Sequence, residues 1–133
     1  MEAIMAGIYA EMAGNGTLSG VLTGGIYWVR APQSADPPYA VIHLNADMRE
    51  DTFTEEGETY QIQINAFEGT EGDDTNILDI FSKMKDVLDY ANLTVAGYNH
   101  IVMKRDGNAR YEYTEDEVWQ LTMFYEAMIQ KSK

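Results

Sequence analysis

One segment, residues 58–91, constrains the fold of this chain more than any other. Its first part, residues 59–67, alternates polar and apolar side chains, which is the pattern of a β-strand with one buried face. A short acidic turn, residues 68–75, leads into a second part with apolar side chains at helical spacing, namely Ile77, Ile80, Phe81, Met84, Leu88 and Ala91. The segment therefore predicts a strand followed by an amphipathic helix whose apolar stripe packs on the sheet.

The rest of the chain adds strands and one more helix to this unit. Asp73, Asp74 and Thr75 are expected to cap the helix at 76–91, because their side chains accept hydrogen bonds from its first amides. Periodicity predicts another helix over 2–13 and four more strands over 26–30, 39–46, 98–105 and 118–129. The segments 18–22, 32–38, 47–58, 110–117 and 131–133 have no assigned strand or helix, and the last is expected to fray.

The predicted order is α-β-β-β-α-β-β. Strands grouped around helices by short turns favour an α+β class, with a mostly antiparallel sheet of about five strands and two helices on one face. No linker or repeat divides the chain, so a single domain over 1–133 is expected.

Two of the predicted strands have clearly different faces. In the strand 39–46, Ala40, Ile42, Leu44 and Ala46 are expected to share the apolar face. In the strand 59–67, the opposite face carries the uncharged amides Gln61, Gln63 and Asn65. Such a face serves either as a polar contact between subunits or as a plain solvent face.

The most acidic stretch is the segment 47–58. Its charged residues include Arg49, Glu50, Asp51, Glu55, Glu56 and Glu58. They lack the alternating ligands, central glycine and terminal glutamate of an EF-hand loop, so calcium binding is not expected. The two remaining interpretations are a solvated hairpin connection and an arm that docks on a partner.

The charge balance limits the partners of the chain. Twenty-two acidic residues against nine basic ones give a formal charge of −13, which disfavours binding to nucleic acids and anionic membranes. The absence of cysteine excludes disulfides and thiolate chemistry. No apolar run approaches the roughly 20 residues of a membrane helix.

The sequence contains no recognisable catalytic or cofactor motif. The two histidines, His43 and His100, have no carboxylate or second imidazole at the spacing of a catalytic or metal site. The Gly24-Gly25 pair leads into a strand, whereas a phosphate-binding loop leads into a helix. Neither an enzyme nor a cofactor is therefore expected.

The order of several short motifs resembles the tail completion proteins of tailed bacteriophages, also called tail terminator or head–tail joining proteins. Each motif is structural, and together they span most of the chain: a first helix ending near Gly14, then Gly25-Ile26-Tyr27, Ala31-Pro32-Gln33, residues 38–42, residues 60–67, Leu88-Asp89, Leu93-Thr94-Val95, Gly97-Tyr98 and Trp119-Gln120.

This resemblance implies a structural virion protein that acts by assembly. It implies a homo-oligomeric ring, usually a hexamer, that caps the tail tube, ends elongation and joins the tail to the head. The resemblance also allows the free subunit to be a monomer in dilute solution. The implied partners are the tail tube protein and the head connector proteins, and DNA passes through the ring without specific binding. The implied location is the virion tail, and the cytoplasm of the host bacterium during assembly.

Two other functions remain open on the sequence alone. The first is a small-ligand-binding or regulatory α+β domain encoded by a host, which requires a closed apolar pocket between helix and sheet. The second is a hydrolase, which requires His43 or His100 to be hydrogen-bonded to a carboxylate beside a cleft.

Overall fold

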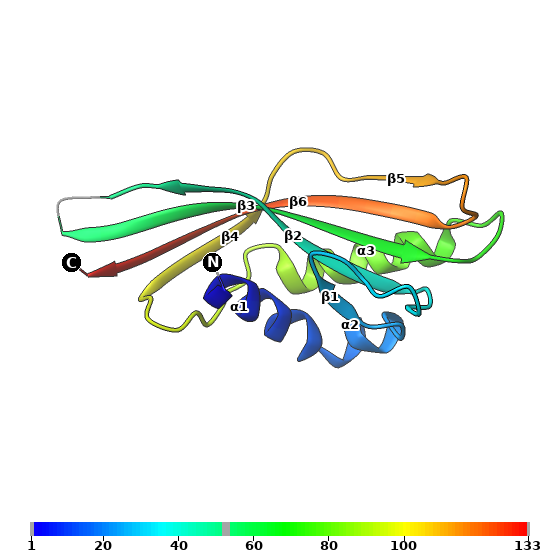
Figure 1. The fold of residues 1–133 in the computed structure, drawn as a ribbon, viewed down its shortest axis with the longest axis horizontal. Coiled ribbons are helices and arrows are strands. Elements are labelled where there is room, and N and C mark those ends of the chain that lie inside the picture. Colours follow the sequence, from blue (N-terminus) through cyan, green and yellow to red (C-terminus); the bar gives the residue numbers. More distant parts are fainter. Residues whose placement is uncertain (1, 52–53, 133) are drawn as a thin grey trace.

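The computed structural model describes residues 2–51 and 54–132. In this described part of the chain, three helices pack on one side of a six-stranded sheet (Figure 1). The elements, in chain order, are α1 (Glu2–Ala13), α2 (Gly16–Val21), β1 (Ile26–Trp28), β2 (Tyr39–Arg49), β3 (Glu55–Glu68), α3 (Thr75–Leu88), β4 (His100–Arg105), β5 (Arg110–Tyr113) and β6 (Trp119–Ser132). The predicted α+β class and mostly antiparallel sheet are confirmed.

The strand order in the sheet is β1-β2-β3-β6-β4, with β5 also paired to β6. The long strands β3 and β6 form the centre, and their antiparallel ladder runs from Glu55 opposite Ser132 to Glu68 opposite Trp119. Strands β4 and β5 follow each other along the outer side of β6. Among the described strands, β1 alone departs from the antiparallel pattern, since it runs parallel to β2.

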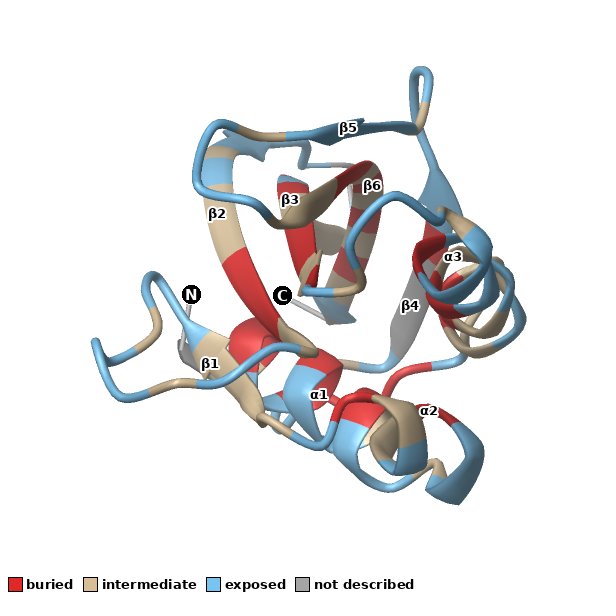
Figure 2. Ribbon diagram, turned by 90° about the vertical axis from the view of Figure 1, so that its right-hand side faces the viewer, coloured by how far each residue is buried: buried red, intermediate tan, exposed pale blue. Residues whose placement is uncertain are grey.

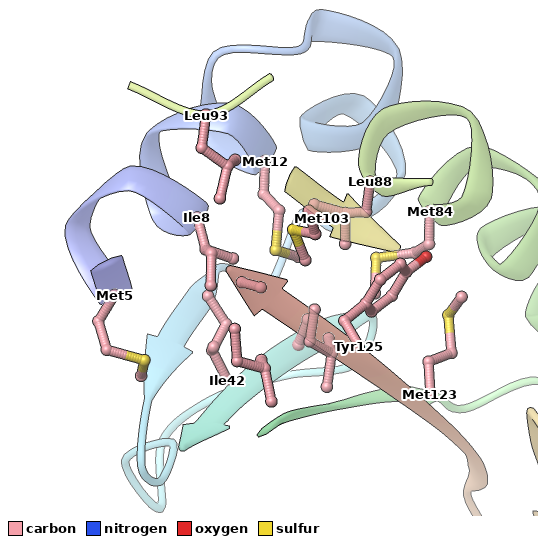
Figure 3. Packing of buried hydrophobic residues seen from close by; sticks show 14 of the residues in the cluster. Met5, Ile8, Met12, Ile42, Met84, Leu88, Leu93, Met103, Met123 and Tyr125 are labelled. Carbon is pink, nitrogen blue, oxygen red and sulfur yellow. The ribbon is translucent and has the colours of Figure 1, made fainter. Parts of the chain in front are cut away.

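The core lies between the sheet and the three helices (Figures 2 and 3). As predicted, the apolar stripe of α3 faces the sheet, and Ile77, Ile80, Met84 and Leu88 are buried. Phe81 is only partly buried at the margin of the core, so the predicted stripe is too wide, and Ala91 lies beyond the end of α3 at Leu88, so the predicted helix is too long. The strands contribute alternate residues, among them Ile42, Ile64, Met123 and Tyr125.

Methionine and branched aliphatic side chains fill the space around α1. Met5, Ile8 and Met12 of α1 are buried, and in Figure 3 Met12 lies beside Met103 of β4, whereas Met5 lies apart from it. Methionine is unbranched and adapts to irregular gaps, which suits a short helix crossing a strongly twisted sheet. This packing fixes α1 although its sequence has only a weak apolar stripe.

Two elements, α2 and β5, and the C-terminal end of β6 lie in segments that the sequence left unassigned. Helix α2 was missed because it contains glycine and serine. It is held by Asn15, whose side chain accepts a hydrogen bond from the Leu18 amide at 3.0 Å, and by the burial of Leu18. Strand β5 lies in the segment 110–117, which was treated as a polar connection. The chain end, expected to fray, continues β6 to Ser132.

The acidic segment 47–58 is mostly strand, so its interpretation as a loop is wrong. Strand β2 continues to Arg49, and β3 begins at Glu55. Each β3 residue in this part also pairs with the end of β6. Because strand pairing is cooperative across the sheet, the partner strand keeps a charged sequence extended that has little β-propensity of its own.

A bulge in β2 changes the predicted face of one residue. The register between β2 and β3 shifts between Leu44 and Ala46, with Leu44 opposite Ile62 and Ala46 opposite Gln61. Gln61 and Ile62 point to opposite faces, so Ala46 lies on the polar face and not on the apolar face predicted for it. The predicted faces of Ala40 and Ile42 are correct, and both are fully buried.

The start of α3 differs in detail from the prediction. Asp74 occupies the N-cap position without a side-chain capping bond. The capping oxygen belongs to Asp73, which accepts a hydrogen bond from the Thr75 amide at 2.9 Å and a second from the Thr75 hydroxyl. These bonds hold the pKa of Asp73 below its usual value.

Candidate interaction surfaces

Two surfaces carry the residues that the sequence singled out. The first is the open face of the sheet, opposite the helices, defined here by Val41, His43, Gln61, Gln63, Asn65, Thr122 and Phe124. The register places these residues on one face, since Val41 pairs with Asn65, His43 with Gln63 and Asn65 with Thr122. The second is the hairpin arm, defined as residues 46–50 and 55–60.

The amides of the open face are linked to one another. The Asn45 side-chain amide donates to Gln63 Oε1 at 3.1 Å, and Gln63 Nε2 donates to Asn65 Oδ1 at 3.2 Å. Gln61 lies on the same face but is exposed. The common face of Gln61, Gln63 and Asn65 is thus as predicted, while their contact with a partner stays a prediction.

The open face also has an aromatic margin that sequence reasoning missed. Tyr39 and Phe67 stack at 4.9 Å between ring centroids, and they border a shallow hollow of about 230 Å³. Val29 and His43 line the same hollow. Val29 has a φ of 68° and a side chain that is 66% exposed, an unusual combination for a β-branched residue. The sequence gives no signal for it, because Tyr27-Trp28-Val29 reads as an ordinary strand.

The hairpin arm extends along the sheet beyond α1, next to the C-terminal end of β6 (Figure 1). Several of its acids have partners within the chain. Arg49 Nε lies 2.9 Å from Asp51, and Glu56 lies 3.8 Å from Arg49 and 3.4 Å from Lys131. These groups are largely solvated, so the ion pairs contribute little to stability.

Other arm acids accept hydrogen bonds from hydroxyl groups. The Thr59 hydroxyl donates to Glu50 at 2.8 Å, and the Tyr60 hydroxyl donates to Glu58. Burial, together with the Glu58 carboxylate, raises the pKa of Tyr60 well above its usual value. Glu50, Glu56 and Glu58 thus help to hold the arm together. The sequence analysis considered these acids only as solvated or docking residues, because their charge alone does not show which partners they have within the chain.

The two rival functions find little support in the described geometry. The hollow between α2, α3 and the sheet measures about 200 Å³ and is lined partly by the polar Glu68, Asn76 and Asp79. That is smaller and more polar than the apolar pockets that bind small molecules. His43 is half-buried on the open face, whereas the side chain of His100 lies outside the described residues.

Metal and membrane sites were also sought in the part of the chain that the structure describes. Within 2–51 and 54–132, no group of three or more histidine or acidic residues is arranged to hold a metal ion. Among the same residues, no helix is long and apolar enough to cross a membrane.

The fold matches solved structures over almost its whole length. One is described as the virion of a native gene transfer agent particle, with a TM-score of 0.78 and 15% identity, covering 97% of this chain and 96% of that one. A second, without a functional description, has a TM-score of 0.64 and 8% identity, covering 96% of this chain and 94% of that one. At such identities the matches establish the fold, which is therefore one found in a virion particle.

The family model for tail completion protein gp17 matches residues 6–130. The chain therefore belongs to the tail completion protein gp17 family, and it is a structural protein of phage tails. The expected family resemblance is thereby confirmed. A search of curated protein sequences finds no match.

Proposed function

We propose that this protein forms a ring, as a hexamer, that caps the tail tube, ends tail elongation and joins the tail to the head. The observation that carries the proposal is the family match over 6–130, combined with a fold built from edges and faces that suit assembly. The ring has two ends, so one meets the tail tube protein and the other meets the head connector proteins. The protein works by contact, without catalysis and without a cofactor, as one domain over 1–133.

The charge of the chain supports a role beside moving DNA. A formal charge of −13 leaves DNA phosphates unneutralised, so DNA slides past the subunits without being retained. The exposed acids Glu71, Asp73 and Glu115 lie on turns at the margin of the sheet, where they can meet basic surfaces of neighbouring virion proteins. In dilute solution the protein is a monomer, and it assembles on the tail in the host cytoplasm.

The open face supports the same proposal. In a strongly acidic chain, the seven residues that define this face include no acid, and Glu126 opposite Gln61 is a charged neighbour at its border. Depletion of charge at the centre of a surface is characteristic of protein contacts. Gln61 and Gln63 accordingly form a polar contact with another virion subunit. Asn65, only 8% exposed, accepts a hydrogen bond from Gln63, and the bonded chain from Asn45 to Asn65 keeps the amides preorganised.

Deleting the gene from the producing phage or prophage tests the proposed function. Electron microscopy of the particles should show tails of uncontrolled length or tails that do not join heads. The intact gene supplied in trans should restore uniform tails. Virions of normal length with attached heads, produced without this protein, would contradict the proposal.

A further inference from the structure

The sheet ends in two free edges that match each other. Strand β1 covers β2 only from Ala40 to Ile42, so none of the described strands lies along the outer side of residues 43–49. On the other side of the sheet, β4 is the terminal strand, and its outer side is also without a described strand. An edge strand presents unpaired backbone groups that readily pair with another chain.

The two edges run in opposite directions. Each of the contacts from β2 to β3, from β3 to β6 and from β6 to β4 is antiparallel. Three reversals make β4 antiparallel to β2. When copies are related by rotation about an axis along the strands, β2 of one copy therefore meets β4 of the next in antiparallel orientation, the commoner arrangement in sheets.

The edges also lie at the same height along the strands. Ala46 is opposite Gln61, Gln61 is opposite Glu126, and Glu126 is opposite Lys104. The same ladders link each residue from 46 to 49 with one residue from 101 to 104. A head-to-tail contact between edges at equal height needs no displacement along the axis, so it closes into a ring and does not climb into a helical filament.

Side chains at the two edges have complementary charge. Asp47 is exposed on β2, and its ladder partner across the sheet is Met103, two positions from Arg105 on the same face. If β2 of one copy lies beside β4 of the next at this height, Asp47 is a diagonal neighbour of Arg105, within reach of a long side chain. Lys104 and Met48, both exposed, then meet on the opposite face.

We infer that neighbouring subunits join edge to edge, with β2 residues 43–49 of one copy paired antiparallel to β4 residues 100–105 of a second copy of this chain. Asp47 contacts Arg105 of the neighbour across this junction. The inference rests on the proposed ring, and it names the surfaces that form it. The interface is heterologous, so every subunit uses both edges and no edge is left open in a closed ring.

Cysteine cross-linking tests the junction directly, because the chain has no native cysteine. We would prepare Ala46→Cys and Lys104→Cys, which lie on the same face and become opposite each other across the junction. A short bismaleimide tolerates a shift of register. Mixing the two variants, concentrated in solution and on assembled tails, should give a covalent dimer that neither variant gives alone. The matched control replaces Lys104→Cys by Ser82→Cys, on the exposed face of α3, and should give no dimer.

A charge exchange gives a second, independent measurement. Asp47→Arg should weaken self-association about twofold to fivefold, the range of one exposed ion pair. Arg105→Glu added to Asp47→Arg should restore part of the loss, because it places a new acid on the same face as the neighbour's new arginine. Circular dichroism melting controls for folding. Equal association of the wild type and Asp47→Arg would contradict the assigned contact.

The outcomes separate this inference from the proposed function. Rings that form on tails without cross-linking between positions 46 and 104 would overturn the edge junction and leave the ring intact. Cross-linking of Ala46→Cys with itself would also overturn it, because that indicates an isologous contact. If no ring forms at any concentration or on any tail, the proposed function fails and the junction fails with it.

Discussion

The hydroxyl of Tyr125, on β6, donates a hydrogen bond of 2.7 Å to Asp89, the residue that ends α3. Tyr125 is 1% exposed, so this bond ties the C-terminal end of the main helix to the centre of the sheet. Asp89 is also 3.5 Å from Arg105. The same carboxylate therefore connects the core to the strand that forms one free edge.

Tyr125→Phe removes this bond while keeping the ring in place. We expect the free energy of unfolding to fall by about 1.5–3 kcal/mol, the range for hydrogen bonds to charged groups. Tyr111→Phe is the matched control, since its 2.9 Å bond to Asp74 is solvent-exposed and its loss should change stability much less. Urea unfolding measures both, and equal losses would contradict the assigned importance of the buried bond.

The same tyrosine predicts a dependence of stability on alkaline pH. Burial, together with the Asp89 carboxylate, raises the pKa of Tyr125 above its ordinary value of 10.0. Its contribution to stability is complete below that value and is lost as the pH rises above it, because only the unfolded state releases the proton. In Tyr125→Phe, the free energy of unfolding should fall less steeply above pH 10.0, by up to about 1.4 kcal/mol per pH unit. Identical slopes for the variant and the wild type would show that Tyr125 ionises freely in the folded protein.

Two neighbouring positions on α3 should differ in their response to truncation. Ile80 is 2% exposed, so Ile80→Ala should cost about 2–5 kcal/mol. Phe81 is only partly buried, with the charged groups of Lys85 and Arg105 lying 4.7 Å and 5.7 Å from its ring centre. Phe81→Ala should therefore cost less than the 3–5 kcal/mol of a buried phenylalanine. Thermal unfolding of both variants checks the order, and a larger loss at Phe81 would contradict this packing.

Replacing Gly57 in the hairpin arm should disturb the arm and leave the packing of the core unchanged. A Cβ added at Gly57 would lie 2.3 Å from the Glu50 carbonyl oxygen, which is closer than atoms approach. Gly57→Ala should thus open the arm and increase amide exchange there, while exchange in α3 stays unchanged. Gly20→Ala is the control: nothing lies within 4 Å of its added Cβ, and alanine should stabilise α2 by about 0.5–1 kcal/mol. Unchanged exchange in the arm of Gly57→Ala would contradict the tight pairing at Glu50.

The sequence predicted those parts of the fold whose pattern is long and local. The alternation in β3 and β6 and the helical spacing in α3 each extend over several turns or residue pairs, so their buried faces could be assigned. The arm, β5 and the C-terminal end of β6 were missed because distant strands, not local propensity, keep them extended. The bulge at Ala46 and the positive φ of Val29 leave no sequence signal at all.

The interaction surfaces were predictable only in part. The alternation placed Gln61, Gln63 and Asn65 on one face, as the register shows. Charge alone marked Glu50, Glu56 and Glu58 as docking residues, but these acids also bond to Thr59, to Arg49 and Lys131, and to Tyr60 within the arm. These bonding partners lie on the facing strand of the hairpin and on β6. The sequence of the acidic segment alone therefore could not identify them.

Locating the protein on purified tails tests the central claim most directly. A gold-labelled tag on the chain, imaged by electron microscopy, should mark the one end of the tail that joins the head. Quantitative mass spectrometry should give the copy number of a single hexamer per tail. Label distributed along the tube, or a copy number that rises with tail length, would contradict the account of this protein as a terminating ring.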